Sequence, residues 1–109
     1  MSAKVEGKTI YLTRGDSLLI NTVPTVDGLR YVPKSGDQIR FALKQDTSDG
    51  EPLIYKQADM TTMRVMLEPT DTKSLEYGTY SYDVELITAN GFVSTFIGPE
   101  KFIITEEVY

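Results

Sequence analysis

The chain has 109 residues, 40% of them hydrophobic, and its 16 acidic residues outnumber 11 basic ones to give a net charge of -5. This length fits a single domain over residues 1–109. The acidic balance repels a phosphate backbone, so we expect no nucleic-acid partner. The chain contains neither histidine nor cysteine, which removes the commonest general base, the commonest nucleophile pairs, and every disulfide or thiolate metal site. We therefore expect no enzyme activity, no catalytic residues, no cofactor and no metal.

The sequence contains no apolar run long enough to cross a bilayer, and its first eight residues contain no apolar segment of the kind found in signal peptides. We therefore expect no contact with a membrane and a protein that is cytoplasmic when synthesised. The absence of cysteine agrees with a reducing compartment.

The first predicted strands are residues 9–13 and 17–23, separated by the turn residues Gly15-Asp16. Residues 38–44 form the clearest strand, because three apolar side chains alternate there with polar ones: Ile39, Phe41 and Leu43. Residues 53–56 and 62–67 are shorter candidates. The chain therefore begins as a series of short strands and turns.

Only residues 70–77 predict a helix, a single turn capped by Thr70 or Asp71 and ended by Gly78. A second clear strand follows at residues 79–86, where aromatic and branched residues alternate with polar ones. Asn90-Gly91 then predicts a tight antiparallel hairpin over residues 86–97, because this pair tolerates the left-handed conformation at both turn positions.

The last predicted strands are residues 92–97 and 101–105. The tail from residue 101 to Tyr109 becomes acidic at its end. Charged residues of this kind often protect the edge strand of a sheet from aggregation. Alternatively, such an edge can pair with a strand of a neighbouring protein. About eight short strands without crossover helices predict an antiparallel sandwich or barrel.

One segment narrows this fold class. Residues 71–82 resemble the corner of immunoglobulin-like domains, in which a short helical turn precedes Gly-x-Tyr and the tyrosine hydroxyl bonds to the backbone upstream. The matching residues are Asp71, Leu75, Gly78 and Tyr80. Tyr82 occupies the position of the disulfide cysteine of antibody domains. The resemblance implies an all-β, immunoglobulin-like antiparallel β-sandwich of about seven to eight strands, outside the antibody class.

Four segments resemble a second family, the small proteins encoded among the tail genes of phages and prophages of Gram-positive bacteria and the N-terminal domain of phage baseplate upper proteins. They are Ile10-Tyr11-Leu12-Thr13-Arg14-Gly15-Asp16-Ser17, residues 31–41 with Gly36-Asp37, Thr70-Asp71-Thr72, and residues 78–84. The resemblance implies a non-catalytic structural protein of a tail or baseplate, located in the virion. Its implied partners are other tail or baseplate proteins or further copies of itself in a homo-oligomer.

Three short motifs have simpler structural interpretations. Arg14-Gly15-Asp16 spells the tripeptide that integrins recognise, but glycine and aspartate are also what a turn between strands requires. Asp46, Asp49 and Glu51 lack the spacing of a calcium loop. Asp83 and Glu85 have a spacing compatible with paired glycosidase carboxylates, but they alternate with core residues and are expected to face solvent.

Seven tyrosines allow a second function. Exposed tyrosines offer a rigid apolar face and a hydroxyl group, which suit carbohydrate or peptide binding. Tyr31, Tyr55 and Tyr109 are the candidate interaction surface. The alternative function is therefore a free-standing carbohydrate- or peptide-binding immunoglobulin-like module, and the sequence leaves these two functions open.

Overall fold

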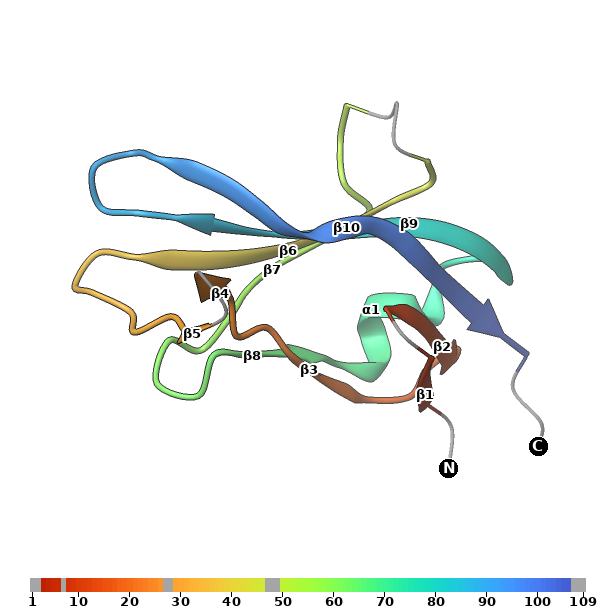
Figure 1. Cartoon of the computed structure of the whole chain (residues 1–109). Coiled ribbons are helices and arrows are strands. Elements are labelled where there is room, and N and C mark those ends of the chain that lie inside the picture. The colour runs from red at the N-terminus through yellow and green to blue at the C-terminus, as the bar shows by residue number, and fades with distance from the viewer. Residues whose placement is uncertain (1–2, 7, 27–28, 47–49, 107–109) are drawn as a thin grey trace.

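A computed structural model of the chain describes residues 3–6, 8–26, 29–46 and 50–106 (Figure 1). Within these residues strands dominate and the only helix is five residues long. The elements in chain order are β1 (Ala3–Glu6), β2 (Thr9–Thr13), β3 (Leu18–Asn21), β4 (Thr25–Val26), β5 (Leu29–Arg30), β6 (Gln38–Lys44), β7 (Ile54–Gln57), β8 (Arg64–Leu67), α1 (Pro69–Lys73), β9 (Gly78–Ile87) and β10 (Val93–Thr105). The expectation of a mostly β chain is confirmed.

The large sheet has six strands in the order β1-β2-β10-β9-β6-β7. Its neighbours are antiparallel except for β2 and β10, which run parallel with Phe102 opposite Ile10. The prediction of an antiparallel arrangement throughout is therefore wrong at this pair. The parallel register has a physical reason, since it places the buried side chains of both strands on one face of the sheet.

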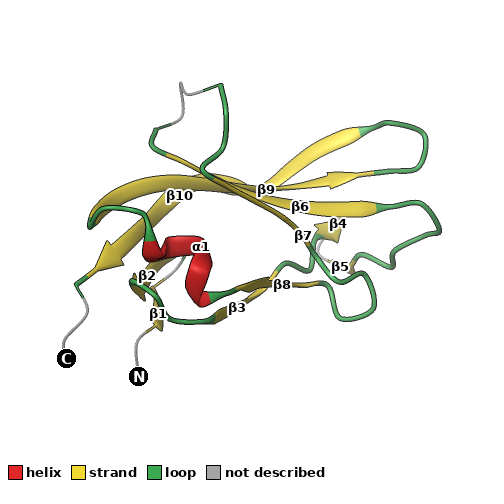
Figure 2. Ribbon diagram, turned by 180° about the vertical axis from the view of Figure 1, so that it is seen from behind, coloured by secondary structure: helices red, strands yellow, loops and turns green. Residues whose placement is uncertain are grey.

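The antiparallel pair β3–β8 forms a second, smaller layer. It lies across the concave side of the curled large sheet, and α1 fills one end of the space between the layers (Figure 2). A third pair, β4–β5, lies at the opposite end. The chain therefore buries its core between two β layers of unequal size.

Most predicted strands are present, and residues 38–44 coincide with β6. The predicted strands 92–97 and 101–105 are one continuous strand, β10, because two register shifts, between Thr95 and Ile97 and between Ile97 and Glu100, let the pairing with β9 continue. β10 lies between β2 and β9, so the expected edge strand at residues 101–105 is an interior strand. β1, β4 and β5 were not predicted.

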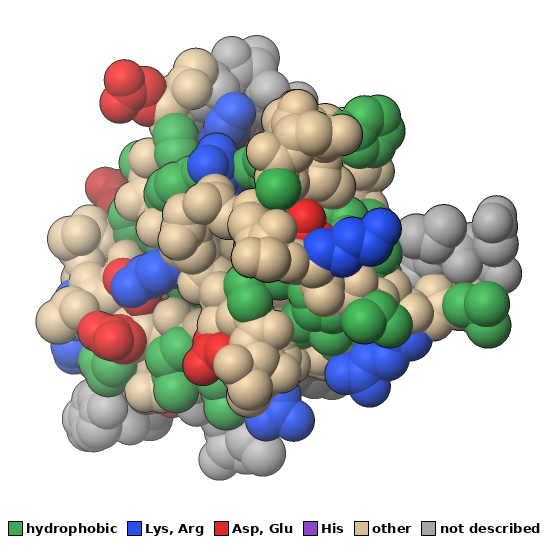
Figure 3. Space-filling view, turned by 90° about the vertical axis from the view of Figure 1, so that its left-hand side faces the viewer, with side chains coloured by type: hydrophobic (Ala, Val, Ile, Leu, Met, Phe, Trp, Pro, Cys, Tyr) green, Lys and Arg blue, Asp and Glu red, His purple; other side chains and the backbone are tan. Residues whose placement is uncertain are grey.

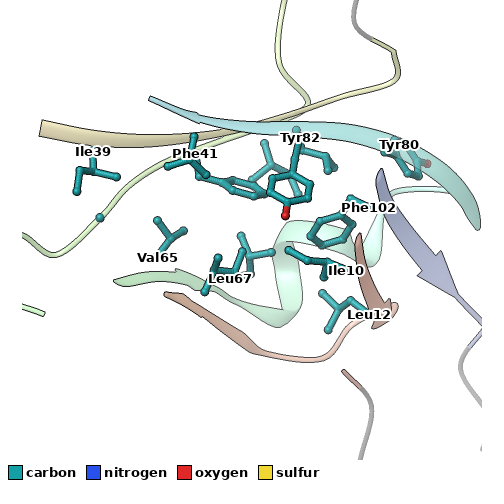
Figure 4. Close-up of a cluster of buried hydrophobic side chains, with 14 of the residues drawn as sticks. Ile10, Leu12, Ile39, Phe41, Val65, Leu67, Tyr80, Tyr82 and Phe102 are labelled. Carbon is teal, nitrogen blue, oxygen red and sulfur yellow. The ribbon is translucent and has the colours of Figure 1, made fainter. Parts of the chain in front are cut away.

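Three aromatic side chains from adjacent strands form the centre of the core (Figure 4). The ring of Phe41 lies 5.6 Å from that of Tyr82 and 6.2 Å from that of Phe102, measured between centroids. Such pairs contribute about 0.5–1.5 kcal/mol each beyond the burial of their area. Tyr82 is buried, and its hydroxyl donates a hydrogen bond to the backbone carbonyl of Lys8. Burial, followed by the nearby charge of Glu100, raises the pKa of Tyr82 to about 12.

The predicted corner lies at the junction of α1 and β9. The Tyr80 hydroxyl donates to the carbonyl of Glu76 at 2.7 Å, which is the bond that a tyrosine corner makes. Burial and the charge of Glu76 raise the pKa of Tyr80. The helix boundaries differ from the prediction. Glu68 is the N-cap, Asp71 lies in the first turn, and the helix ends at Lys73 with Ser74 as its C-cap. Gly78 does not end the helix but begins β9.

Asp71 fixes α1 from two sides. Its carboxylate accepts a hydrogen bond from the backbone N–H of Glu68 at 2.7 Å. It also forms an ion pair with the ammonium group of Lys56 on β7, at 3.1 Å. Asp71 therefore joins the large sheet to the start of the helix, while Leu75 packs against the core beyond the helix.

The Arg14-Gly15 turn is attached to this same corner. The guanidinium of Arg14 lies 4.3 Å from the centroid of the Tyr77 ring, and it donates to the Tyr77 hydroxyl at 3.0 Å. The backbone N–H of Gly15 donates to the hydroxyl of Thr72 at 2.8 Å. These contacts give the tripeptide a structural role in holding β2 to α1, in agreement with the simpler interpretation of the motif.

The β9–β10 hairpin is present and antiparallel, but its turn is wider than predicted. Thr88 donates its backbone N–H to the carbonyl of Phe92, and Gly91 donates to the carbonyl of Thr88, both at 2.9 Å. Within this turn only Gly91 is left-handed, with φ of 90°. Asn90 acts through its side chain, whose oxygen accepts the backbone N–H of Phe92 at 3.3 Å. Phe92 is the last residue of this five-residue connection and is 65% exposed.

Candidate interaction site at the loop end

A hollow of about 490 Å³ lies at one end of the sandwich, between the loop that precedes β6 and the β9–β10 hairpin. Figure 3 views the molecule from this end, where hydrophobic side chains lie among basic and acidic ones. Its lining comes from these two loops alone: Tyr31, Lys34, Ser35, Asp37, Thr88, Ala89, Asn90 and Phe92. We call this region the loop end.

Asp37 holds the two loops together. Its carboxylate accepts the hydroxyl of Tyr31 at 2.5 Å and the backbone N–H of Lys34 at 2.9 Å. The Tyr31 hydrogen bond is the main cause that lowers the pKa of Asp37, with further contributions from the backbone N–H groups of Lys34 and Ala89. The same bond raises the pKa of Tyr31. Asp37 therefore anchors the loop before β6 through its Oδ2 atom, which accepts both of these hydrogen bonds.

The two loops approach each other closely at Gly36. A Cβ atom at this position would lie 2.7 Å from the Cβ of Ala89, and Gly36 has φ of 90°. Both features favour glycine, because a side chain here would push the loops apart and strain the backbone. The shape of the hollow therefore depends on Gly36 as well as on Asp37.

Large apolar side chains are exposed around the hollow. Val32 and Phe92 flank it and are 75% and 65% exposed, while Leu29 and Val93, on β5 and β10, are 72% and 52% exposed. Arg30 and Lys34 are exposed beside them. The loop end thus combines an apolar centre with basic residues on a chain of net negative charge. Exposed apolar patches rimmed by polar residues mark sites of protein–protein contact.

The structure describes two of the three predicted tyrosines, and these two lie on different parts of the chain. Tyr31 lines the hollow, whereas Tyr55 lies on β7 opposite Ala42, 49% exposed, with the Arg40 guanidinium 5.8 Å from its ring centroid. Tyr109 lies outside the described residues. The neighbour of Tyr31 in the hollow is Phe92, which the sequence interpretation did not select.

The remaining acidic residues form no metal site among the residues that the structure describes, since no group of three or more possible ligands occurs there. Asp46 and Glu51 are exposed, and Asp49 lies outside the described residues. Asp83 and Glu85 alternate with buried residues of β9 and are partly exposed on the outer face of the sheet. In the described part of the chain no helix is both long and apolar enough to cross a membrane.

The sequence analysis did not predict two further residues of the loop end as part of a binding site, and the reason can be identified. Asp37 and Asn90 each belong to a turn signal, Ser35-Gly36-Asp37 or Asn90-Gly91, and turn chemistry explained both fully. Their joint role arises only because the sheet places β6 beside β9, with Gln38 opposite Ile87. That register brings the loop before β6 against the loop after β9.

Comparison of the chain with protein-family models, with curated proteins and with solved structures finds no match. The interpretation of the loop end therefore depends on its geometry and on the chemistry of its residues. That chemistry is apolar contact with a basic rim, built on two loops that Asp37 holds in place.

Proposed function

We propose that this chain is a non-catalytic, immunoglobulin-like domain that serves as a structural protein of a bacteriophage or prophage tail or baseplate and binds protein partners at the loop end. The strand order supports the fold. β6, β9 and β10 are neighbours, as strands C, F and G are in immunoglobulin-like domains, and β3 pairs with β8 as strand B pairs with strand E. Tyr80 lies near the start of β9, the strand that corresponds to F.

The exposed apolar residues of the loop end are the observation that carries the proposal. Phe92 and Val32 offer apolar surface to solvent beside a hollow that is large enough for a partner's side chains. In variable immunoglobulin domains the loops between strands B and C and between F and G form the binding end. The corresponding connections here are the one from β3 to β6, which includes the short pair β4–β5, and the one from β9 to β10. An aromatic residue near the centre of such a patch is typical of a residue that dominates binding energy.

The exposed side chains of the loop end favour a protein over a sugar. Leu29, Val32 and Phe92 offer apolar surface of the kind that protein–protein contacts bury. Carbohydrate or peptide binding remains the second candidate function, because Tyr31 presents an aromatic ring in the hollow.

The tail or baseplate setting comes from the sequence resemblance, and it is tested by genetics. We expect deletion of the gene from the phage or prophage that carries it to give particles with defective tails. The wild-type gene and a Leu53→Lys variant, which alters a 48% exposed leucine in the loop before β7, should restore them. Phe92→Lys should fail to restore them although the purified variant keeps its melting temperature. Normal virions after deletion, or full rescue by Phe92→Lys, would contradict the proposal.

The proposal also includes assembly of the chain with itself or with neighbouring tail proteins. We expect light scattering across a concentration series to give the mass of a defined oligomer, and Phe92→Lys to reduce that mass. A specific hit on a glycan array, lost in Tyr31→Ala, would instead establish the second candidate function.

A further inference from the structure

Two strand edges on one side of the sandwich have no partner strand among the described residues. β3 pairs with β8 along one edge and with no strand along the other. β10 pairs with β2 only over residues 102–105, so its first half, residues 93–97, has β9 on one side alone. Unpaired edges expose rows of backbone N–H and C=O groups, which are a template for an additional strand.

A hollow of about 330 Å³ lies between these two edges. Its lining combines residues of β3 and β10 with residues near the start of the chain: Lys8, Ile10, Leu19, Ile20, Asn21, Tyr82 and Ile97. Ile10 and Tyr82 are core residues, 1% and 4% exposed. Leu19, at the rim, is 52% exposed. The hollow therefore reaches the core through the gap between the layers, and we call it the side hollow.

The shape and chemistry of the side hollow specify its occupant. A backbone edge is satisfied only by another extended backbone, and alternate side chains of that strand then point to one face. Four of the seven lining residues are aliphatic, namely Ile10, Leu19, Ile20 and Ile97, so apolar side chains of the added strand are complementary to the hollow. Lys8 is the only charged residue in the lining, so a carboxylate at one end of the added strand is complementary to it.

We propose that the β3 edge accepts an extended segment of a partner protein as an added strand, with alternate apolar side chains entering the side hollow and a carboxylate beside Lys8. This surface is separate from the loop end and goes beyond the function proposed above. The added strand would extend the small layer from two strands to three. It would also cover Leu19, which is 52% exposed at the rim of the hollow.

A library of random eight-residue peptides displayed on beads, selected on the immobilised full chain, tests this proposal directly. We expect enrichment of peptides with apolar residues at every second position and an acidic residue near one end. Hydrogen exchange of the complex should show slower exchange at the β3 amides. Leu19→Lys should weaken an enriched peptide about tenfold or more in Kd, since it removes an apolar contact and places at the rim of the hollow an ammonium group that the added strand would have to desolvate.

Leu29→Lys is the matched control, because Leu29 is an exposed leucine of the loop end. Its Kd for the enriched peptide should stay within about twofold of wild type, which is less than 0.5 kcal/mol. Selection without enrichment, enriched peptides without alternation, or slower exchange confined to residues 88–92 would overturn the proposal. Loss of binding in Leu29→Lys but not in Leu19→Lys would assign peptide binding to the loop end instead.

Discussion

The Tyr31 hydroxyl donates a hydrogen bond of 2.5 Å to the carboxylate of Asp37, six residues later in the chain. This bond turns the loop before β6 back on itself and leaves the Tyr31 ring against the hollow that Phe92 borders. Asp37 also accepts the backbone N–H of Lys34, and the backbone N–H of Ala89 on the hairpin contributes to lowering its pKa, so this carboxylate anchors one loop and faces the other.

Asp37 should make the loop end sensitive to acid. Its pKa lies below the ordinary value of 3.8, mainly through the Tyr31 hydrogen bond. A lowered carboxyl pKa stabilises the fold above the unfolded-state pKa, and this stability is lost as the pH falls through the lower folded-state value. We expect Asp37→Asn to lower the unfolding free energy at pH 7, and the difference from wild type to shrink below about pH 4.

Urea unfolding at pH 7 and at pH 3 measures this difference. Tyr31→Phe is the control, since it removes the hydroxyl but keeps the carboxylate and its backbone N–H partners. It should have a smaller effect at pH 7 than Asp37→Asn. An equal loss for Asp37→Asn at both pH values would show that the charge of Asp37 does not stabilise the loops.

The tyrosine corner gives a prediction that depends on a single atom. Tyr80→Phe removes the hydroxyl that bonds to the carbonyl of Glu76 and leaves the buried ring in place. Loss of such a bond costs about 1 kcal/mol of unfolding free energy. Denaturant unfolding should show this decrease with an unchanged slope. Tyr77→Phe, at a 45% exposed tyrosine that donates no such buried bond to the backbone, is expected to cost less. Equal effects of the two variants would argue against a stabilising corner.

Arg14 should contribute to stability and not to binding. Arg14→Ala removes both the contact with the Tyr77 ring and the hydrogen bond to the Leu75 carbonyl, so we expect a loss of about 1 kcal/mol of unfolding free energy. Arg14→Lys keeps the charge but not the planar group and should lose part of this stability. Assembly, measured by light scattering at a temperature where both variants are folded, should match wild type. If the protein supported specific integrin-dependent cell adhesion and Arg14→Ala abolished it, the tripeptide would be an integrin-binding motif.

The sequence predicts best the strands whose pattern is local. β6 and β9 alternate strictly, because one face packs on the core and the other meets solvent, and both strands were predicted within one residue of their bounds. The sequence predicts two strands in place of β10, because Gly98-Pro99 interrupts the alternation of apolar and polar residues. In the structure, irregularities in the register allow β10 to stay paired with β9 on both sides of these residues. β4 and β5, two residues each, are too short to show any period.

Pairing between distant segments is what the sequence does not predict. The parallel pairing of β2 with β10 places Ile10 opposite Phe102, two residues from opposite ends of the chain. The sequence contains no turn motif that would predict this pairing. The loop end shows the same limit. Tyr31 was identified as a contact residue by its chemistry alone, whereas its neighbours Asp37 and Phe92 acquire their role from the register of β6 with β9 and from the width of the hairpin.

The alkaline limit of stability should be set in part by Tyr82. Its pKa is raised from 10.0 to about 12, chiefly because burial disfavours the phenolate. A raised pKa stabilises the fold fully below the unfolded-state value, and this contribution is lost as the pH rises from about 10 to about 12. We expect the unfolding free energy of wild type to fall more steeply across this window than that of Tyr82→Phe.

Urea unfolding at half-unit pH steps measures the unfolding free energy of both proteins as a function of pH. All other ionisable side chains are the same in both proteins, so their effects cancel in the difference. Parallel curves between pH 10 and 12 would show that the Tyr82 hydroxyl is not held in the protonated form by the core, and would place it in contact with solvent through the side hollow.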